Sequence, residues 1–396
     1  MYPSAAHLQD PRLKRAAAHA RETDDLTFSQ QVELTGVPAP PFQEGPRGEV
    51  MARLLRDAGL DRTWKDAEGN VLALRPGQAG LPPVVLCAHL DTVFPPETPI
   101  ALLRDGDLVE GPGISDNGRG LAVLLAVARA LDAGGVATRH PVLFAATVGE
   151  EGVGDLRGAR HLVGPEGAGR GAAAFIAVDG AGLEQVVTRG LGSRRFRVRV
   201  RGPGGHSWLD RGTVNPIDAL ARLVTAVRMP EPPAGDEWTF SCGRCGGGTS
   251  VNAIPEEAWA DVDCRSTSAP HLDAMADELR RAGAEAVARR GPEERGTLAM
   301  EIEALGFRPA GATDPGSAVV HAARLATDAV GAVPRLTLAS TDANAAMAAG
   351  IPAVTLGGGG EAGLAHTTRE WYRNAGGADG VVRALYAVGL TAGLHS

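Results

Sequence analysis

The sequence predicts an α/β domain that is interrupted by a smaller α+β domain. Three observations support this fold class. The chain has 396 residues, which is too long for one ordinary domain of about 100–200 residues. Apolar runs alternate with helical patterns from about residue 28 to 188 and again after residue 305. Between these two segments apolar residues alternate with charged ones, which is typical of a sheet with one face in water.

The first α/β segment contains short runs rich in Val, Leu and Ala. Such runs are typical of buried parallel strands, and the patterns between them favour helices. The expected elements are a helix near 46–58, a strand at 84–88, a helix at 119–131 and strands at 142–148 and 174–178.

The interrupting segment begins with SRRFRVRVRG, whose period-two alternation predicts a strand. VNPIDALARLVTAVRM follows as an amphipathic helix, EEAWADVDCRS as a strand and HLDAMADELRRAGAEAVARR as a long helix. After it we expect a helix near 316–330, the strand IPAVTLG and a helix from about residue 375. The predicted boundaries place the larger domain at 1–188 and 306–396 and the inserted α+β domain at 189–305.

Composition excludes several classes of protein. Hydrophobic residues make up 44% and charged residues 22%, with a net charge of −8, as expected of a soluble protein. Without a clustered basic face we expect no nucleic-acid partner and no anionic membrane surface. No run approaches the ~20 apolar residues of a membrane span, and the N-terminus lacks the apolar core of a secretory signal. We therefore predict a cytoplasmic protein.

The four cysteines are too few and too irregularly spaced for a disulfide framework, so we expect reduced thiols. Cys242 and Cys245 have the C-x-x-C spacing of a metal or redox pair. No second pair or nearby histidine completes a zinc site, and we interpret the spacing as incidental.

Metal-competent side chains follow the predicted strands. His89 and Asp91 end the first apolar run, Glu150 and Glu151 the second, and Asp179 the third. In open α/β sheets the carboxyl ends of the strands are where ligands bind. Imidazole and carboxylate ligands suit Zn²⁺ and also admit Co²⁺ or Mn²⁺. Asp116 and His366 add two further metal-competent side chains. Together these residues predict a two-metal hydrolytic site.

Residue types also suggest roles within this site. Asp116, in a tight Ser-Asp-Asn-Gly turn, is the best candidate for a carboxylate that spans two ions about 3.5–4 Å apart. His89 and Asp91 lie on one face of an extended segment, so Asp91 can hold the far nitrogen of His89. The neighbours Glu150 and Glu151 point in opposite directions, so one can bind metal while the other acts as general base.

Nine segments, in order along the chain, resemble motifs of the M20 family of metallopeptidases. This family includes peptidase T, carnosinase-like dipeptidases, glutamate carboxypeptidases, and acetylornithine and succinyl-diaminopimelate deacylases. The segments are AHLDTVFP (88–95), GPGISDNGRG (111–120), TVGEEGVGDLRGAR (147–160), AVDG (177–180), GPGGHSW (202–208), GGTSVNAIPEEA (247–258), DVDCR (261–265), STDAN (340–344) and GGGGEAGLAHT (357–367).

The resemblance implies a mixed-sheet di-metal exopeptidase catalytic domain with an inserted dimerisation, or lid, domain. It implies that Glu150 is the general base and that the peptide bond after Asp116 is cis. It also implies two ligand sets, which are His89, Asp116 and Asp179 for one ion and Asp116, Glu151 and His366 for the other.

The inserted domain carries implied roles of its own. His206 resembles the family histidine that reaches into the active site of the partner subunit and stabilises the oxyanion. Asn252 and Arg265 match family positions that contact the substrate backbone or carboxylate, and the planar fork of Arg suits a carboxylate. We therefore expect a homodimer formed through the inserted domain.

The expected function is hydrolysis of amide bonds in small peptides. Asp179 stands where some relatives have Glu, which favours the amino- and dipeptidase branch, whereas HLDTVFPP resembles the glutamate carboxypeptidases. LASTDAN departs from the corresponding segment of peptidase T. The alternative is an N-acyl-amino-acid deacylase, and a remote alternative is a peptide-binding relative without catalysis. The intact ligand set and the Glu150 base argue against the last of these.

Overall fold

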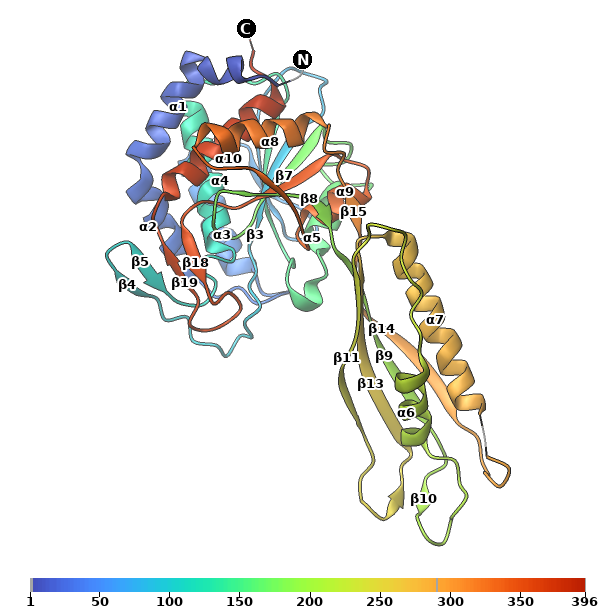
Figure 1. The fold of residues 1–396 in the computed structure, drawn as a ribbon. Helices are drawn as coiled ribbons and strands as arrows, with labels where there is room; N and C mark the ends of the chain where they lie inside the picture. The colour runs from blue at the N-terminus through green and yellow to red at the C-terminus, as the bar shows by residue number, and fades with distance from the viewer. Residues whose placement is uncertain (1–2, 290, 396) are drawn as a thin grey trace. The chain divides into compact units, whose positions relative to one another are not determined.

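The computed structural model of the chain describes residues 3–289 and 291–395. The chain forms two compact units, Met1–Gly190 with Ala312–Ser396, and Leu191–Gly311 (Figure 1). The predicted boundary after residue 305 falls inside β14 (Ala299–Arg308). That strand pairs with β9 (Gly192–Arg201) along its length, which keeps residues 306–308 in the inserted unit.

A nine-stranded mixed sheet forms the centre of the larger unit. The strand order is β1-β2-β6-β3-β7-β17-β8-β15, with β16 paired to β8. The four strands from β6 to β17 are parallel to one another, and β2 and β8 run antiparallel to their neighbours in this group. The bounds are β1 Thr63–Lys65, β2 Val71–Arg75, β3 Val84–His89, β6 Val142–Thr147, β7 Ala174–Val178, β8 Gln185–Gly190, β15 Gly311–Ala312, β16 Arg335–Ala339 and β17 Ala353–Leu356.

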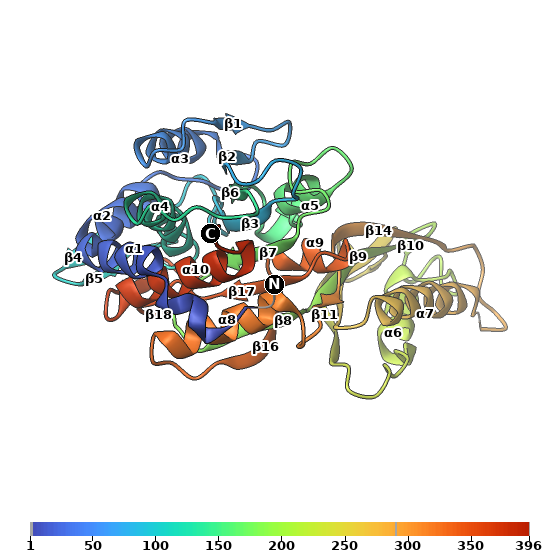
Figure 2. The ribbon, with the colours of Figure 1, turned by 90° about the horizontal axis from the view of Figure 1, so that it is seen from above.

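Helices cover both faces of this sheet, which is why its central strands are apolar throughout. Val84 and Leu86 of β3 belong to one buried cluster, whereas Val85 and Cys87 belong to another. Figure 2 shows α4 and α10 on one side of β3 and β7, with α5 and α9 on the other. The bounds are α1 Pro11–Glu22, α2 Asp24–Thr35, α3 Gly45–Asp57, α4 Gly118–Ala133, α5 Arg157–Val163, α8 Ala318–Ala329, α9 Ala343–Ala348 and α10 Gly377–Ala392.

The predicted strands at 84–88, 142–148, 174–178 and 351–357 are the four central parallel strands β3, β6, β7 and β17. The predicted helices near 46–58, 119–131 and 316–330 correspond to α3, α4 and α8. The predicted α/β class is therefore confirmed, and the sheet is mixed as expected.

A small four-stranded sheet lies outside the sequence predictions. Its order is β18-β19-β5-β4, and each strand has three residues, too few to show a period in the sequence. Tyr372 and Val109 of this sheet are buried in one cluster with Phe28 and Ile114. The bounds are β4 Leu103–Asp105, β5 Leu108–Glu110, β18 Glu361–Gly363 and β19 Trp371–Arg373.

The inserted unit is an antiparallel sheet with two helices on one face. Its strand order is β11-β13-β9-β14, and Val198 of β9 packs with Leu272 and Leu279 of α7 in one core. The charged residues between the apolar ones in β9 lie on the other face and form ion pairs, as between Arg197 and Asp261 at 2.7 Å. The bounds are β9 Gly192–Arg201, β10 Gly205–His206, α6 Pro216–Ala226, β11 Trp238–Gly247, β12 Ala253–Ile254, β13 Glu257–Ser266, α7 Ala269–Ala288 and β14 Ala299–Arg308.

Among residues 3–289 and 291–395, no helix has the length and hydropathy needed to cross a membrane.

Candidate metal centre

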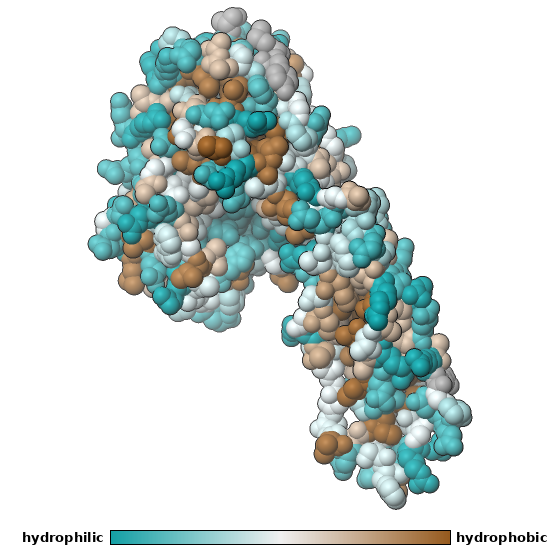
Figure 3. Space-filling model, viewed as in Figure 1, coloured by the Kyte–Doolittle hydropathy of each residue, from teal (hydrophilic) through white to brown (hydrophobic). Residues whose placement is uncertain are grey.

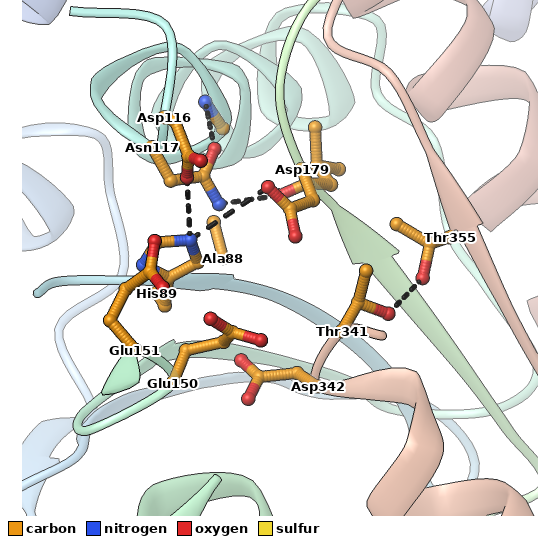
Figure 4. Close-up of polar contacts among 12 residues, drawn as sticks. Ala88, His89, Asp116, Asn117, Glu150, Glu151, Asp179, Thr341, Asp342 and Thr355 are labelled. Atoms are coloured by element: carbon orange, nitrogen blue, oxygen red, sulfur yellow. Dashed lines mark hydrogen bonds and ion pairs between the residues drawn. The ribbon is translucent and has the colours of Figure 1, made fainter. Parts of the chain in front are cut away.

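The predicted metal ligands come from separate segments of the larger unit. His89 is the last residue of β3, and Glu150 and Glu151 follow β6. Asp179 follows β7. Because β6, β3 and β7 are parallel neighbours, their carboxyl ends lie at one edge of the sheet. Figure 4 shows these side chains and that of Asp116 gathered at this edge.

Asp116 stands between two groups of possible ligands. Its Oδ1 lies 3.0 Å from Nε2 of His89, which is 3.7 Å from Oδ1 of Asp179. Its Oδ2 lies 3.1 Å from Nε2 of His366, which is also 3.1 Å from Oε1 of Glu151. In each group of three, the ligand atoms lie within 4.8 Å of one another. The two oxygens of one carboxylate thus face two different ligand sets.

These groups shift each other's pKa values. Hydrogen bonds with Asp116 and Glu151 raise the pKa of His366 to about 10. Burial acts to raise the pKa of Asp116, but hydrogen bonds with His366 and His89 outweigh it and lower that pKa. Burial acts to lower the pKa of His89, but hydrogen bonds with Asp116 and Asp179 raise it overall. A divalent ion bound by these groups would displace protons from the histidines.

The backbone around Asp116 also matches expectation. The peptide bond between Asp116 and Asn117 is cis, as predicted. The Asn117 side chain accepts a hydrogen bond from the backbone N–H of Gly120 and so caps α4. Its amide donates to the carbonyl of Val178 at 2.9 Å, which joins this turn to the end of β7.

Asp91 contacts the predicted nitrogen of His89 more closely through its backbone than through its carboxylate. The carbonyl oxygen of Asp91, and not its carboxylate, lies 2.9 Å from Nδ1 of His89. The nearer carboxylate oxygen is 3.7 Å away. The carboxylate instead accepts hydrogen bonds from the backbone N–H groups of Glu150 at 2.9 Å and Glu151 at 2.8 Å. The backbone carbonyl of Asp91 therefore contacts the imidazole, and the carboxylate holds the loop of Glu150 and Glu151.

The sequence from residue 85 to 388 matches the model of peptidase family M20/M25/M40. The chain belongs to this family. The family predicted from the nine motifs is confirmed, and so is the predicted class of enzyme, a hydrolytic metallopeptidase.

Individual proteins similar to this chain are distant in sequence. A Bacillus subtilis (strain 168) protein, named uncharacterized protein YqjE, is 24% identical over 358 residues, which cover 86% of this chain and 91% of that protein. The structure of aminopeptidase PepT from Bacillus cereus has 23% identity and a TM-score of 0.74, covering 91% of this chain and 98% of that one. YXEP of Bacillus subtilis, described as a dinuclear metal-binding M20 peptidase, has 17% identity and a TM-score of 0.68, covering 94% and 98%. At these identities the two structural similarities show the shared fold.

Asp342 is a further buried carboxylate near these groups of possible ligands. Its side chain is 3% exposed, and burial raises its pKa to about 6. One carboxylate oxygen accepts a hydrogen bond from the hydroxyl of Thr147, at the end of β6. Figure 4 shows the carboxylates of Asp342 and Glu150 pointing toward one another. The STDAN motif contains Asp342, but no spacing within the sequence indicated its proximity to Glu150.

The structure brings His206 and Asn252 together within the inserted unit. His206 lies in β10, which pairs with β12, and the carbonyl of Asn252 accepts a hydrogen bond from the N–H of Ser207 at 3.0 Å. The exposed imidazole of His206 accepts hydrogen bonds at Nδ1 from the N–H groups of Trp208 and Leu209. Its Nε2 is therefore the nitrogen that can donate to a ligand.

Arg265 lies at the other end of the inserted sheet. Arg265 is the second-last residue of β13. Asn252 precedes β12, and the chain continues from β12 to Glu257, the first residue of β13. At about 3.3 Å per residue the eight steps along β13 separate these positions by roughly 26 Å. Nε of Arg265 donates to Oδ2 of Asp263 at 2.7 Å. The guanidinium therefore already has a carboxylate partner on its own strand.

Glu370 is a residue of the site region that the sequence reasoning missed. It is fully buried, and its carboxylate accepts hydrogen bonds from the turn that carries Asp116. Its one visible signal in the sequence was its position four residues after His366. The C-x-x-C pair lies elsewhere, in β11, and the groups of possible ligands found among the described residues contain no cysteine.

Proposed function

We propose that this M20 chain is a di-metal exopeptidase that hydrolyses amide bonds in small peptides. One observation carries the proposal, namely that the two oxygens of Asp116 face His89 and His366 separately. Such a carboxylate is what a pair of ions about 3.5–4 Å apart requires. Glu150, 4% exposed, lies beside this arrangement and is held by Asp91.

Five side chains would hold the ions. His89 and Asp179 would bind one, Glu151 and His366 the other, and Asp116 both. This donor set suits Zn²⁺ first and admits Co²⁺ or Mn²⁺. Two such ions would supply Lewis acidity and lower the pKa of a bound water toward neutrality.

Glu150 would perform the proton transfers. Its carboxylate would accept a proton from the attacking water and return it to the leaving amine. Its backbone N–H donates to the Asp91 carboxylate at 2.9 Å, so the main chain that carries the base is held before substrate binds. Glu151, held in the same way at 2.8 Å, remains available to an ion.

We further propose that the protein is a homodimer and that His206 acts in the active site of the partner subunit, where Nε2 would donate to the oxyanion. The separation of roughly 26 Å between the His206 and Arg265 ends of one sheet supports this, because both cannot contact one small peptide. Trp208, Leu209 and Val251 are exposed beside His206, and such apolar side chains suit an interface. Figure 3 shows brown, apolar groups at that end of the inserted unit. Asn252, beside His206, would then contact the partner's substrate, and Arg265 would bind a substrate carboxylate.

Hydrolysis of a defined panel tests the function. Metal-free protein would be refilled with Zn²⁺, Co²⁺ or Mn²⁺ and given di- and tripeptides beside N-acetyl- and N-succinyl-amino acids. We expect metal-dependent peptide cleavage that Glu150→Ala removes and that Glu166→Ala, an exposed carboxylate after α5, leaves intact. Cleavage of the acylated amino acids alone would instead assign the deacylase activity, and metal binding without any hydrolysis would refute catalysis. The cytoplasmic location stays a prediction from the sequence.

A further inference from the structure

Glu370 links the two parts of the chain that carry Asp116 and His366. It lies at the end of the loop that joins β18 to β19 and contains His366. The backbone carbonyl of Glu370 accepts a hydrogen bond from the N–H of Gly111 at 2.7 Å, where the pairing of β19 with β5 ends. The hairpin therefore runs directly alongside the segment that leads to Asp116.

The carboxylate of Glu370 continues this pairing into the Asp116 turn. Oε1 accepts hydrogen bonds from the N–H of Ser115 at 2.7 Å, the hydroxyl of Ser115 at 2.6 Å and the N–H of Asp116 at 2.8 Å. Oε2 accepts one from the N–H of Gly113 at 3.0 Å. One side chain thus accepts four hydrogen bonds from three residues of the turn, Gly113, Ser115 and Asp116.

A carboxylate is a costly choice for this position. Glu370 is 0% exposed and lies close to Asp116, another carboxylate. A buried charge is tolerated when it is fully hydrogen-bonded, and N–H bonds to a charged acceptor are roughly twice as strong as neutral ones. Apolar packing of Tyr372 against Ile114 already joins the hairpin to the turn. The added polar contact therefore points to a role in fixing the position of Asp116, in addition to holding the hairpin against the turn.

We propose that Glu370 is a positioning residue for metal binding, which it achieves by joining the Asp116 turn to the His366 hairpin. Asp116 and His366 face each other across 3.1 Å although they are 250 residues apart in sequence. Glu370 is four residues from one of them and contacts the backbone of the other. This inference rests on the proposed di-metal function, because it assigns the residue that assembles the bridging ligand and one terminal ligand of that site.

Three variants test the proposal. Glu370→Gln keeps the shape but places an amide N–H₂ against at least one N–H donor. Ser115→Ala removes only the hydroxyl donor and leaves the three backbone bonds in place. Glu361→Gln is the matched control, since it neutralises an exposed glutamate at the start of the same hairpin.

Calorimetric titration of metal-free protein measures the number of bound Zn²⁺ ions and their affinity. The melting temperature and peptide hydrolysis as a function of free Zn²⁺ are measured on the same variants. We expect Glu370→Gln to weaken Zn²⁺ binding by about 10- to 100-fold. Its lost hydrolysis should return as free Zn²⁺ is raised, which a merely structural residue would not produce. Ser115→Ala should shift the affinity in the same direction by a smaller factor, and Glu361→Gln should not shift it.

Wild-type affinity for two Zn²⁺ ions in a folded Glu370→Gln variant would overturn the inference while leaving the proposed function intact. If Glu370→Gln does not fold, Ser115→Ala decides, and an unchanged Zn²⁺ affinity in that variant overturns the inference. Wild-type protein that binds none of Zn²⁺, Co²⁺ and Mn²⁺ would instead refute the di-metal function itself.

Discussion

Replacing Asp91 by Asn tests how Glu150, the proposed general base, is held. The Asp91 carboxylate is 0% exposed and accepts hydrogen bonds from the N–H groups of Glu150 and Glu151 at 2.9 and 2.8 Å. Asn has one oxygen in place of two, and its N–H₂ group would face one of these donors. The variant therefore keeps the size of the side chain but loses one charge-assisted hydrogen bond to the loop.

The free energy of the lost hydrogen bond sets the size of the effect. A hydrogen bond to a charged group contributes about 1.5–3 kcal/mol. If that free energy is lost from the productive loop conformation, the rate falls tenfold for each ~1.4 kcal/mol. The expected loss in kcat is therefore about 10- to 150-fold. KM should change little, because Asp91 is covered by the loop and does not reach the substrate.

Steady-state hydrolysis of the best peptide from the panel measures kcat and KM, and Zn²⁺ content is measured on the same samples. Asp10→Asn is the control, since Asp10 also accepts a backbone N–H bond, from Arg12 at 2.8 Å, but does so at the start of α1. We expect this control to retain wild-type kcat. A metal-replete Asp91→Asn variant with a kcat within about threefold of wild type would show that the Asp91 carboxylate does not position the base.

Three further predictions concern other parts of the chain. Burial raises the pKa of Asp342 from its ordinary value of 3.8 to about 6, so the contribution of this carboxyl to the stability of the metal-free protein should fall as pH rises between these values. Asp342→Asn should change how the free energy of unfolding, measured by chemical denaturation, depends on pH. The same pH dependence in the variant and the wild type would contradict the prediction. Replacing Cys242 and Cys245 by Ser should leave Zn²⁺ stoichiometry unchanged in a calorimetric titration, whereas a lost ion would make the pair a metal site. His206→Ala should lower kcat by about 10²- to 10³-fold with metal content intact. Mixing it with Glu150→Ala should restore about a quarter of the activity if His206 serves the partner subunit, and no recovery would refute that role.

The central sheet was accessible from the sequence because its strands are buried on both faces. Continuous apolar runs such as VVLCAH are rare outside such strands, and β3, β6 and β7 begin where the runs begin. The small sheet of β4, β5, β18 and β19 gave no comparable signal, since strands of three residues cannot show a period. The predicted boundary after residue 305 falls within β14 of the inserted unit, because the end of this strand is determined by its pairing with β9.

Residue identity determined the ligand types by itself, because histidine and carboxylate at the ends of parallel strands meet at one edge of the sheet. Only the tertiary structure decided how they are held. The Asp91 carboxylate binds backbone N–H groups 59 and 60 residues away, and Glu370 binds a turn about 255 residues away. Local periodicity carries no information on such contacts, because each depends on where two distant segments meet in space. The sequence therefore determined which atoms could bind a metal, and the fold decided which side chains fix those atoms in place.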